Sequence, residues 1–215
     1  PSTTYPRLAP GEPQAAWQRV VDEVHGAGGR IFPQLWHEGL KWRREGPNID
    51  PSVRQLGPSG LRLDGSEAGS PMTIDEIEAV ISAYGVSARL ARESGFDGIE
   101  IHAAHGHLID QFFWSGTNRR SDHFGGDLVG RTQFAAEVVR EIRRSVGPDY
   151  PICLRFSQWK YLNYNARPVE TPDELGRFLE PLIEAGVDIF HCSTRRFWEA
   201  TFEGSDLNLA GWTKK

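Results

Sequence analysis

The sequence has 215 residues, of which 39% are hydrophobic and 25% charged, a balance typical of one soluble folded domain. A formal net charge of −5 gives no electrostatic reason to bind nucleic acid or an acidic membrane surface, because both depend on clustered Lys and Arg. No apolar run approaches the roughly 20 residues of a membrane-spanning helix, and Cys153 and Cys192, each within an apolar run, favour a reducing, cytoplasmic setting over a disulfide framework.

Four times along the chain, an amphipathic helical pattern ends at glycine and is followed by a short apolar run. The first helix is predicted over 13–26, and a strand over 30–36 follows it. The second helix opens with Thr73 and Glu76 at capping-box spacing, and a strand over 98–102 follows it. This order of elements indicates βαβ winding.

The pattern continues with a helix over 134–146, before a strand over 151–156, and with a helix over 171–186, before a strand over 187–192. Pro172 suits the first turn of the last of these helices. The side chains predicted to face the core from the four helices are Trp17, Val20, Val21, Val24, Ile77, Val80, Ile81, Tyr84, Ala88, Ala91, Phe134, Val138, Val139, Ile142, Val146, Leu175, Phe178, Leu179, Leu182 and Ile183.

Strands that are apolar on both faces and joined by helices belong in a parallel sheet that helices cover. The predicted fold class is therefore α/β, as a partial (β/α)8 TIM barrel of about four βα units. A closed barrel takes about 250 residues, so its first and last units are expected outside this chain, and a fifth strand would be due near 211–215. Residues 1–215 are predicted to form a single barrel domain with a long loop at 39–71. The rival is an open doubly wound sheet, but no Gly-x-Gly-x-x-Gly follows any strand.

Polar side chains gather toward the carboxyl ends of the predicted strands. They are Gln34, Trp36, His37, His102, His105, His107, Arg155 and His191. Barrel enzymes build their active sites at that rim, although strand ends are also where polar side chains ordinarily meet solvent. The spread over four units favours a site.

Three histidines, His102, His105 and His107, form the densest polar group. Two imidazoles three residues apart could donate hydrogen bonds to one substrate oxygen and so polarise a carbonyl or nitro group. A metal site is a second interpretation, since imidazole is a frequent zinc ligand, but no Asp, Glu or Cys ligand accompanies the group. A third is that the histidines bond to backbone within a loop.

Arg155 stands in a strand otherwise made of apolar residues, where a guanidinium must find an anionic or strongly accepting partner. Glu100 in a neighbouring strand is one candidate. A bound cofactor is the other, and a reduced flavin develops negative charge at N1 and the C2 carbonyl. Gln34 offers both a donor and an acceptor, which suits the edge of a pyrimidine ring.

Three motifs carry a resemblance to a known family: FPQLWH at 32–37, GFDGIEIHAAHGHLIDQFF at 95–113 and TNRRSDHFGG at 117–126. Together they resemble the Old Yellow Enzyme family of FMN-dependent ene-reductases. The likeness continues through Arg131, through 151–157 and through the strand at 191–193, so it covers nearly all of the chain.

The resemblance implies that NADH or NADPH reduces FMN, which then passes hydride to the β-carbon of an activated alkene, a small-molecule substrate. It implies that Gln34 and Arg155 hold the flavin ring and that His102 and His105 grip the substrate oxygen, with Trp36 beside them. His107 stands where the family often has a tyrosine that protonates the α-carbon, and histidine can supply that proton near neutral pH. Oligomeric state stays open, a homo-oligomer included.

Two alternatives remain. The family takes its FMN phosphate contacts from its last two barrel units, so this chain by itself is expected to bind FMN poorly. It could then be a noncatalytic barrel fragment without flavin. A metal-dependent barrel hydrolase that uses the cluster at His102 is the other alternative.

Overall fold

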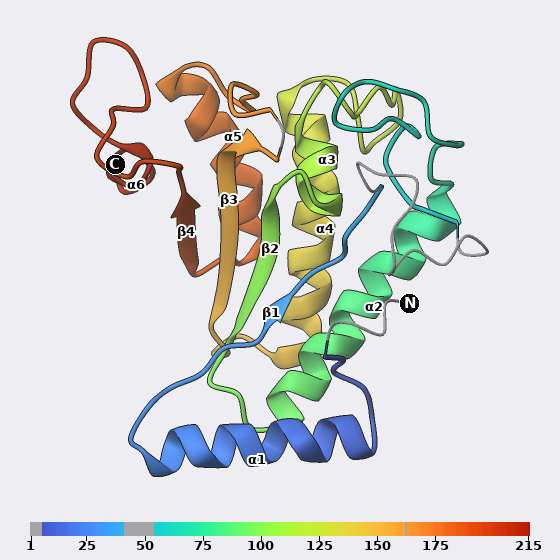
Figure 1. Ribbon diagram of the computed structural model, residues 1–215, viewed down its shortest axis with the longest axis vertical. Helices are drawn as coiled ribbons and strands as arrows, with labels where there is room; N and C mark the ends of the chain where they lie inside the picture. Colours follow the sequence, from blue (N-terminus) through green and yellow to red (C-terminus); the bar gives the residue numbers. More distant parts are fainter. Residues whose placement is uncertain (1–5, 41–53, 162) are drawn as a thin grey trace.

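The computed structural model describes residues 6–40, 54–161 and 163–215. Its centre is a parallel sheet in which each strand pairs with the next along the chain, in the order β1-β2-β3-β4 (Figure 1). The strands are β1 (Gln34–Leu35), β2 (Ile99–His105), β3 (Ile152–Lys160) and β4 (Ile189–Ser193). This α/β arrangement is the predicted wall of a partial (β/α)8 barrel, whose consecutive strands are neighbours.

Six helices accompany the sheet within the described residues. They are α1 (Glu12–Gly26), α2 (Ile74–Glu93), α3 (Leu108–Phe113), α4 (Leu128–Val146), α5 (Pro172–Ala185) and α6 (Leu209–Thr213). In Figure 1, α2, α4 and α5 run alongside the sheet, while α1 lies across the end at which the strands begin. No helix within the described residues is long and apolar enough to cross a membrane.

The capping box predicted for α2 and both predicted ends of α5 are present. Thr73 accepts from the backbone N–H of Glu76, whose carboxylate accepts from the N–H of Thr73, so the capping box of α2 is complete. At the start of α5, Thr171 accepts from the N–H of Glu174, whose carboxylate accepts from the N–H of Glu170 rather than from that of Thr171. The helix ends at Gly186, whose left-handed φ of 106° suits a residue without Cβ.

The core lies between the sheet and α2, α4 and α5. All five apolar residues predicted to face inward from α4 are fully or almost fully buried: Phe134, Val138, Val139, Ile142 and Val146. They pack with Ile99, Ile101, Ile152 and Leu154 of the central strands. Burial of one such side chain stabilises the fold by about 1.5–3 kcal/mol, so this layer fixes the sheet against the helices.

Two side chains predicted to face the core, Val20 and Ile183, are exposed instead. In α1 only Val21 is buried, and Val20 is 42% exposed, because α1 crosses the end of the sheet and touches it along a narrow line. Trp17 still packs at the core's edge, against Phe96. In α5, Ile183 is 57% exposed because it lies beside the buried stripe rather than on it.

Some element bounds also differ from expectation. The first strand is paired as a strand only over Gln34–Leu35 rather than 30–36, whereas β3 runs on to Lys160, past its predicted end at 156. The short helix α3 was not predicted, and α6 occupies the region in which a fifth strand was expected. Residues 41–53 of the long loop lie outside the described residues, and its remainder lies near the carboxyl ends of the strands (Figure 1).

Candidate functional site

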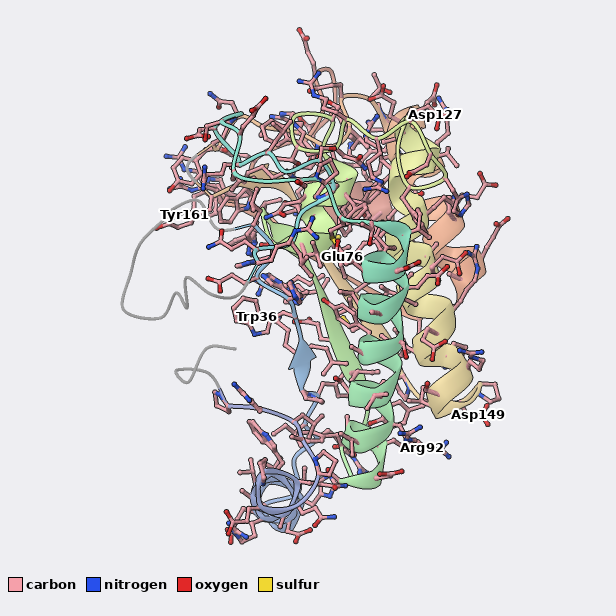
Figure 2. All side chains as sticks on the ribbon, turned by 90° about the vertical axis from the view of Figure 1, so that its right-hand side faces the viewer. Trp36, Glu76, Arg92, Asp127, Asp149 and Tyr161 are labelled. Atoms are coloured by element: carbon pink, nitrogen blue, oxygen red, sulfur yellow. The ribbon has the colours of Figure 1, made fainter. Side chains whose placement is uncertain are left out.

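The sheet register places the predicted site residues at one end of the strands. Gln34 pairs with Glu100, and His102, Arg155 and His191 occupy one row across three neighbouring strands. Trp36 follows β1 directly, and Figure 2 shows it beyond the arrowhead of that strand, at the end opposite Arg92 and Asp149. The carboxyl ends of the strands therefore bring the predicted rim residues to the same edge.

Glu100 is the centre of a hydrogen-bond network on this edge. Its carboxylate accepts from Nε2 of Gln34 and, at 2.6 Å, from Nδ1 of His191. The thiol of Cys153 lies 3.5 Å from it. Burial opposes ionisation of Glu100, but the bonds from His191 and Gln34 outweigh this effect and keep the pKa of the carboxyl below its usual value. Glu100 is thus a charged anchor for two other rim residues.

Arg155 does not pair with Glu100, so that sequence-based candidate is wrong. Within the described part of the chain, the buried Nε of Arg155 has no hydrogen-bond partner, and neither does the buried Nδ1 of His102. A buried polar group without a partner costs about 1–3 kcal/mol. Two such groups in one row of the sheet fit a bound molecule that supplies hydrogen-bond partners there.

The three imidazoles lie close together. The ring centroid of His102 is 5.2 Å from that of His105 and 4.8 Å from that of His107. Trp36 meets the ring of His107 edge-on, at 5.0 Å. Burial, with smaller contributions from the neighbouring cations, lowers the pKa of His102 to about 3 and that of His105 to about 4. Both rings are therefore neutral at pH 7, and each carries one N–H donor.

His107 forms a hydrogen bond with backbone, as the third interpretation of the histidines predicted. Burial lowers its pKa, and a hydrogen bond with the backbone of Glu38 partly offsets that effect. His107 is thus held against the segment that follows β1. No group of three His, Cys, Asp or Glu side chains in the described ranges is arranged to hold a metal ion.

His105 has the most constrained position in the site. Its backbone φ of 62° is left-handed, which non-glycine residues seldom adopt. Its N–H donates to Oγ of Ser157 (3.0 Å), and its ring Nε2 lies 2.7 Å from Oγ of Ser193. Its ring also stacks on Trp159. The β2–β3 register shifts between Ala103 and His105, which lets His105 reach β4.

Sequence reasoning missed Ser157, Ser193 and Trp159, which contact His105, and also the buried pair Asp110 and Lys160. Ser157 and Trp159 were passed over because both lie beyond residue 156, the predicted end of their strand. Asp110 carried a usable signal. A carboxylate inside the apolar run LIDQFF must have a buried partner.

These features define a class: a partial βα barrel with a polar rim of neutral imidazoles, an amide and a guanidinium. Comparison with known proteins identifies the family. Residues 4–202 match the NADH:flavin oxidoreductase / NADH oxidase family. The chain belongs to this family, the Old Yellow Enzyme family, whose members use FMN.

Individual relatives agree with the match. The chain is 32% identical over 225 residues to 12-oxophytodienoate reductase 2 of Arabidopsis thaliana, covering 93% of this chain and 59% of the relative. It is 36% identical over 189 residues to NADH oxidase of Thermoanaerobacter brockii, covering 87% of this chain and 28% of the relative. Morphinone reductase, solved in complex with tetrahydroNAD, superposes with a TM-score of 0.73 at 27% identity over 92% of this chain and 60% of that one.

The comparisons confirm the resemblance read from the sequence motifs, the α/β partial-barrel fold and FMN as the family's cofactor. The chain spans between 28% and 60% of the length of these three proteins. The single-domain boundary at 1–215 and the roles of individual site residues stay predictions.

Proposed function

We propose that the protein transfers hydride from NADH or NADPH, through FMN, to an activated alkene such as an α,β-unsaturated carbonyl compound. The observation that carries the proposal is the pair His102 and His105, two neutral imidazoles with ring centroids 5.2 Å apart. They stand in the same rim as Arg155, which has a buried donor without a partner among the described residues. The family match supports the reaction class.

In this proposal, Gln34 and Arg155 hold FMN. The guanidinium of Arg155 would neutralise negative charge on the flavin, and Gln34, oriented by its bond to Glu100, would keep its amide oxygen free to accept. FMN, when bound, supplies the hydride chemistry.

His102 and His105 would donate hydrogen bonds to the substrate's carbonyl oxygen. Charge develops on that oxygen as the alkene is reduced, so these bonds strengthen in the transition state and lower the barrier. Their low pKa values keep the rings as neutral donors, and the bond to Ser193 fixes how the ring of His105 is turned. Trp36 would form the wall of the substrate mouth, next to His107.

His107 is proposed to protonate the α-carbon. Since burial lowers its pKa, only a minority of molecules carry the protonated ring at pH 7, and that fraction grows as the pH falls. Turnover limited by this step would accordingly rise in mild acid. Solvent is the other source of the proton, and it would leave turnover independent of His107.

The direct test is an assay of the protein expressed from its natural reading frame and supplied with FMN. Oxidation of NADH or NADPH should depend on 2-cyclohexenone, and the product should be cyclohexanone. His123 is exposed in the loop before α4, so His123→Ala is the control for variants that lack His102 or His105. If the enone does not change the rate at which NADH or NADPH is oxidised, the proposed substrate class is contradicted.

A further inference from the structure

A fully buried ion pair lies directly behind the imidazole cluster. Nζ of Lys160, the last residue of β3, is 2.6 Å from Oδ1 of Asp110, in the first turn of α3, and both side chains have 0% exposure. The pair joins the carboxyl end of β3 to the helix that follows the turn carrying His105 and His107.

The same carboxylate also holds that turn. Oδ2 of Asp110 accepts from the backbone N–H of Gly106 at 2.6 Å. Both residues at the bend have left-handed backbones, with φ of 62° at His105 and 87° at Gly106. Next to the ion pair, the N–H of Tyr161 donates to the carbonyl of His105 at 3.2 Å. The bend is therefore tied to β3 through Asp110 and Lys160 on one side and through the backbone on the other.

The energetics argue against stability as the main role of the pair. Replacing a buried ion pair by apolar residues of similar volume is often neutral or stabilising, because two charges must be removed from water. A non-glycine residue in the left-handed region costs about 1–3 kcal/mol and persists only where its surroundings hold it. Here an ion pair that is costly to bury holds a bend that carries both an unfavourable backbone conformation and a site imidazole.

We propose that Lys160 and Asp110 are positioning residues that hold the turn at His105–Gly106 so that His105 and His102 face one substrate oxygen. The inference rests on the proposed function for its kinetic consequence, whereas its structural consequence, a fixed His105 ring, can be measured without substrate or FMN. Lys160 fixes the carboxylate, the carboxylate fixes the Gly106 N–H, and the bend fixes the imidazole.

The test compares three variants. Lys160→Met alone leaves a buried carboxylate without its cation and is expected to lower thermal stability strongly. The double variant Lys160→Met/Asp110→Asn removes both charges, while the asparagine can still accept from Gly106. Asp188→Asn is the control for the hydrogen-bond pattern. Like Asp110, Asp188 pairs with a cation, Arg143, and accepts from a backbone N–H, that of Ile152, but it is half-exposed and lies at the opposite end of the sheet.

The double variant is expected to melt within a few degrees of the parent protein yet to show shifted ring ¹⁵N signals for His105, because residue 110 has lost its tie to β3. In the FMN-loaded protein, its kcat with 2-cyclohexenone should fall about tenfold to a hundredfold, as small misplacements of catalytic groups do. Asp188→Asn should change melting temperature and leave both the His105 signals and kcat unaltered.

Unchanged His105 signals in a folded double variant would overturn the proposal, and so would a double variant that cannot fold, since the pair would then be a requirement of the fold itself. Shifted His105 signals in a protein that never reduces the enone would support the positioning role and contradict only the proposed function. The two failures are thereby separable.

Discussion

The ring of His105 stacks on the indole of Trp159, with centroids 4.3 Å apart and planes inclined by 28°. Trp159 belongs to β3 and His105 to the end of β2, so this contact, together with the bond to Ser193, sets the plane of the imidazole across three strands. The orientation of the proposed substrate-binding ring thus depends on residues that take no part in the reaction.

Replacing Trp159 by leucine is expected to loosen that ring. An aromatic pair is worth about 0.5–1.5 kcal/mol beyond its buried area, which corresponds to a rise of about 2- to 12-fold in KM for the alkene. Trp159→Phe keeps a stacking face and should recover most of the loss. Steady-state kinetics on both variants make the comparison, and equal KM values for leucine and phenylalanine at this position would show that stacking has no such role.

Acid should destabilise the fold through His102. Its pKa in the folded protein is about 3 because it is buried, whereas an unfolded histidine titrates near 6.5. As the pH falls below 6.5, the unfolded chain binds a proton that the folded chain does not, so stability is lost progressively down to about pH 3. Between pH 7.5 and pH 5, this one group contributes a loss of about 2 kcal/mol.

The check is chemical denaturation at those two pH values for the parent protein and for His102→Gln. The variant lacks the group and should lose about 2 kcal/mol less on acidification. The exposed His123 offers the control, His123→Gln, which should follow the parent protein. Parallel curves for the parent and His102→Gln would mean that His102 is not the buried neutral base described above.

The same substitution, isoleucine to alanine, is expected to have different effects on stability in the core and at the surface. Ile142→Ala in α4 removes a side chain that is 0% exposed and should cost about 2–5 kcal/mol in the free energy of unfolding. Ile183→Ala in α5 removes one that is 57% exposed and should cost less than about 1 kcal/mol. Urea denaturation measures both. Equal costs would place Ile183 in the core, as the sequence pattern had predicted.

Ile142 and Ile183 also show what hydrophobic periodicity can and cannot predict. The apolar stripe of α4 is buried as expected because α4 lies between α2 and α5 and against the sheet, so each residue of the stripe meets a neighbouring element. Ile183 fits an apolar pattern equally well, but the neighbours of α5 cover a narrower face. Periodicity gives the apolar side of a helix, and only the tertiary arrangement decides how wide a face is covered.

The site, like the helix faces, could be predicted from the sequence only in part. The position of the polar residues near the carboxyl ends of the strands, with the parallel order of the strands, was enough to predict that Gln34, His102, Arg155 and His191 share one edge. The register shift after Ala103 and the left-handed backbone of His105 could not be predicted. Both depend on hydrogen bonds that the backbone of the bend donates to Ser157 and Asp110. Ser157 is distant in sequence, and so is Lys160, which holds the nearby Asp110. The motif identified the histidines without showing what holds them.

The most direct test of the central claim measures the two half-reactions separately in His102→Ala, His105→Ala and the double variant, each loaded with FMN. If the imidazoles donate to the substrate oxygen, reoxidation of the reduced flavin by 2-cyclohexenone should slow by about 10²–10³-fold for each single change. Reduction of the flavin by NADH or NADPH should slow far less than this reoxidation. Reoxidation by the enone at the parent rate in the double variant would contradict the claim that these two rings bind and polarise the substrate.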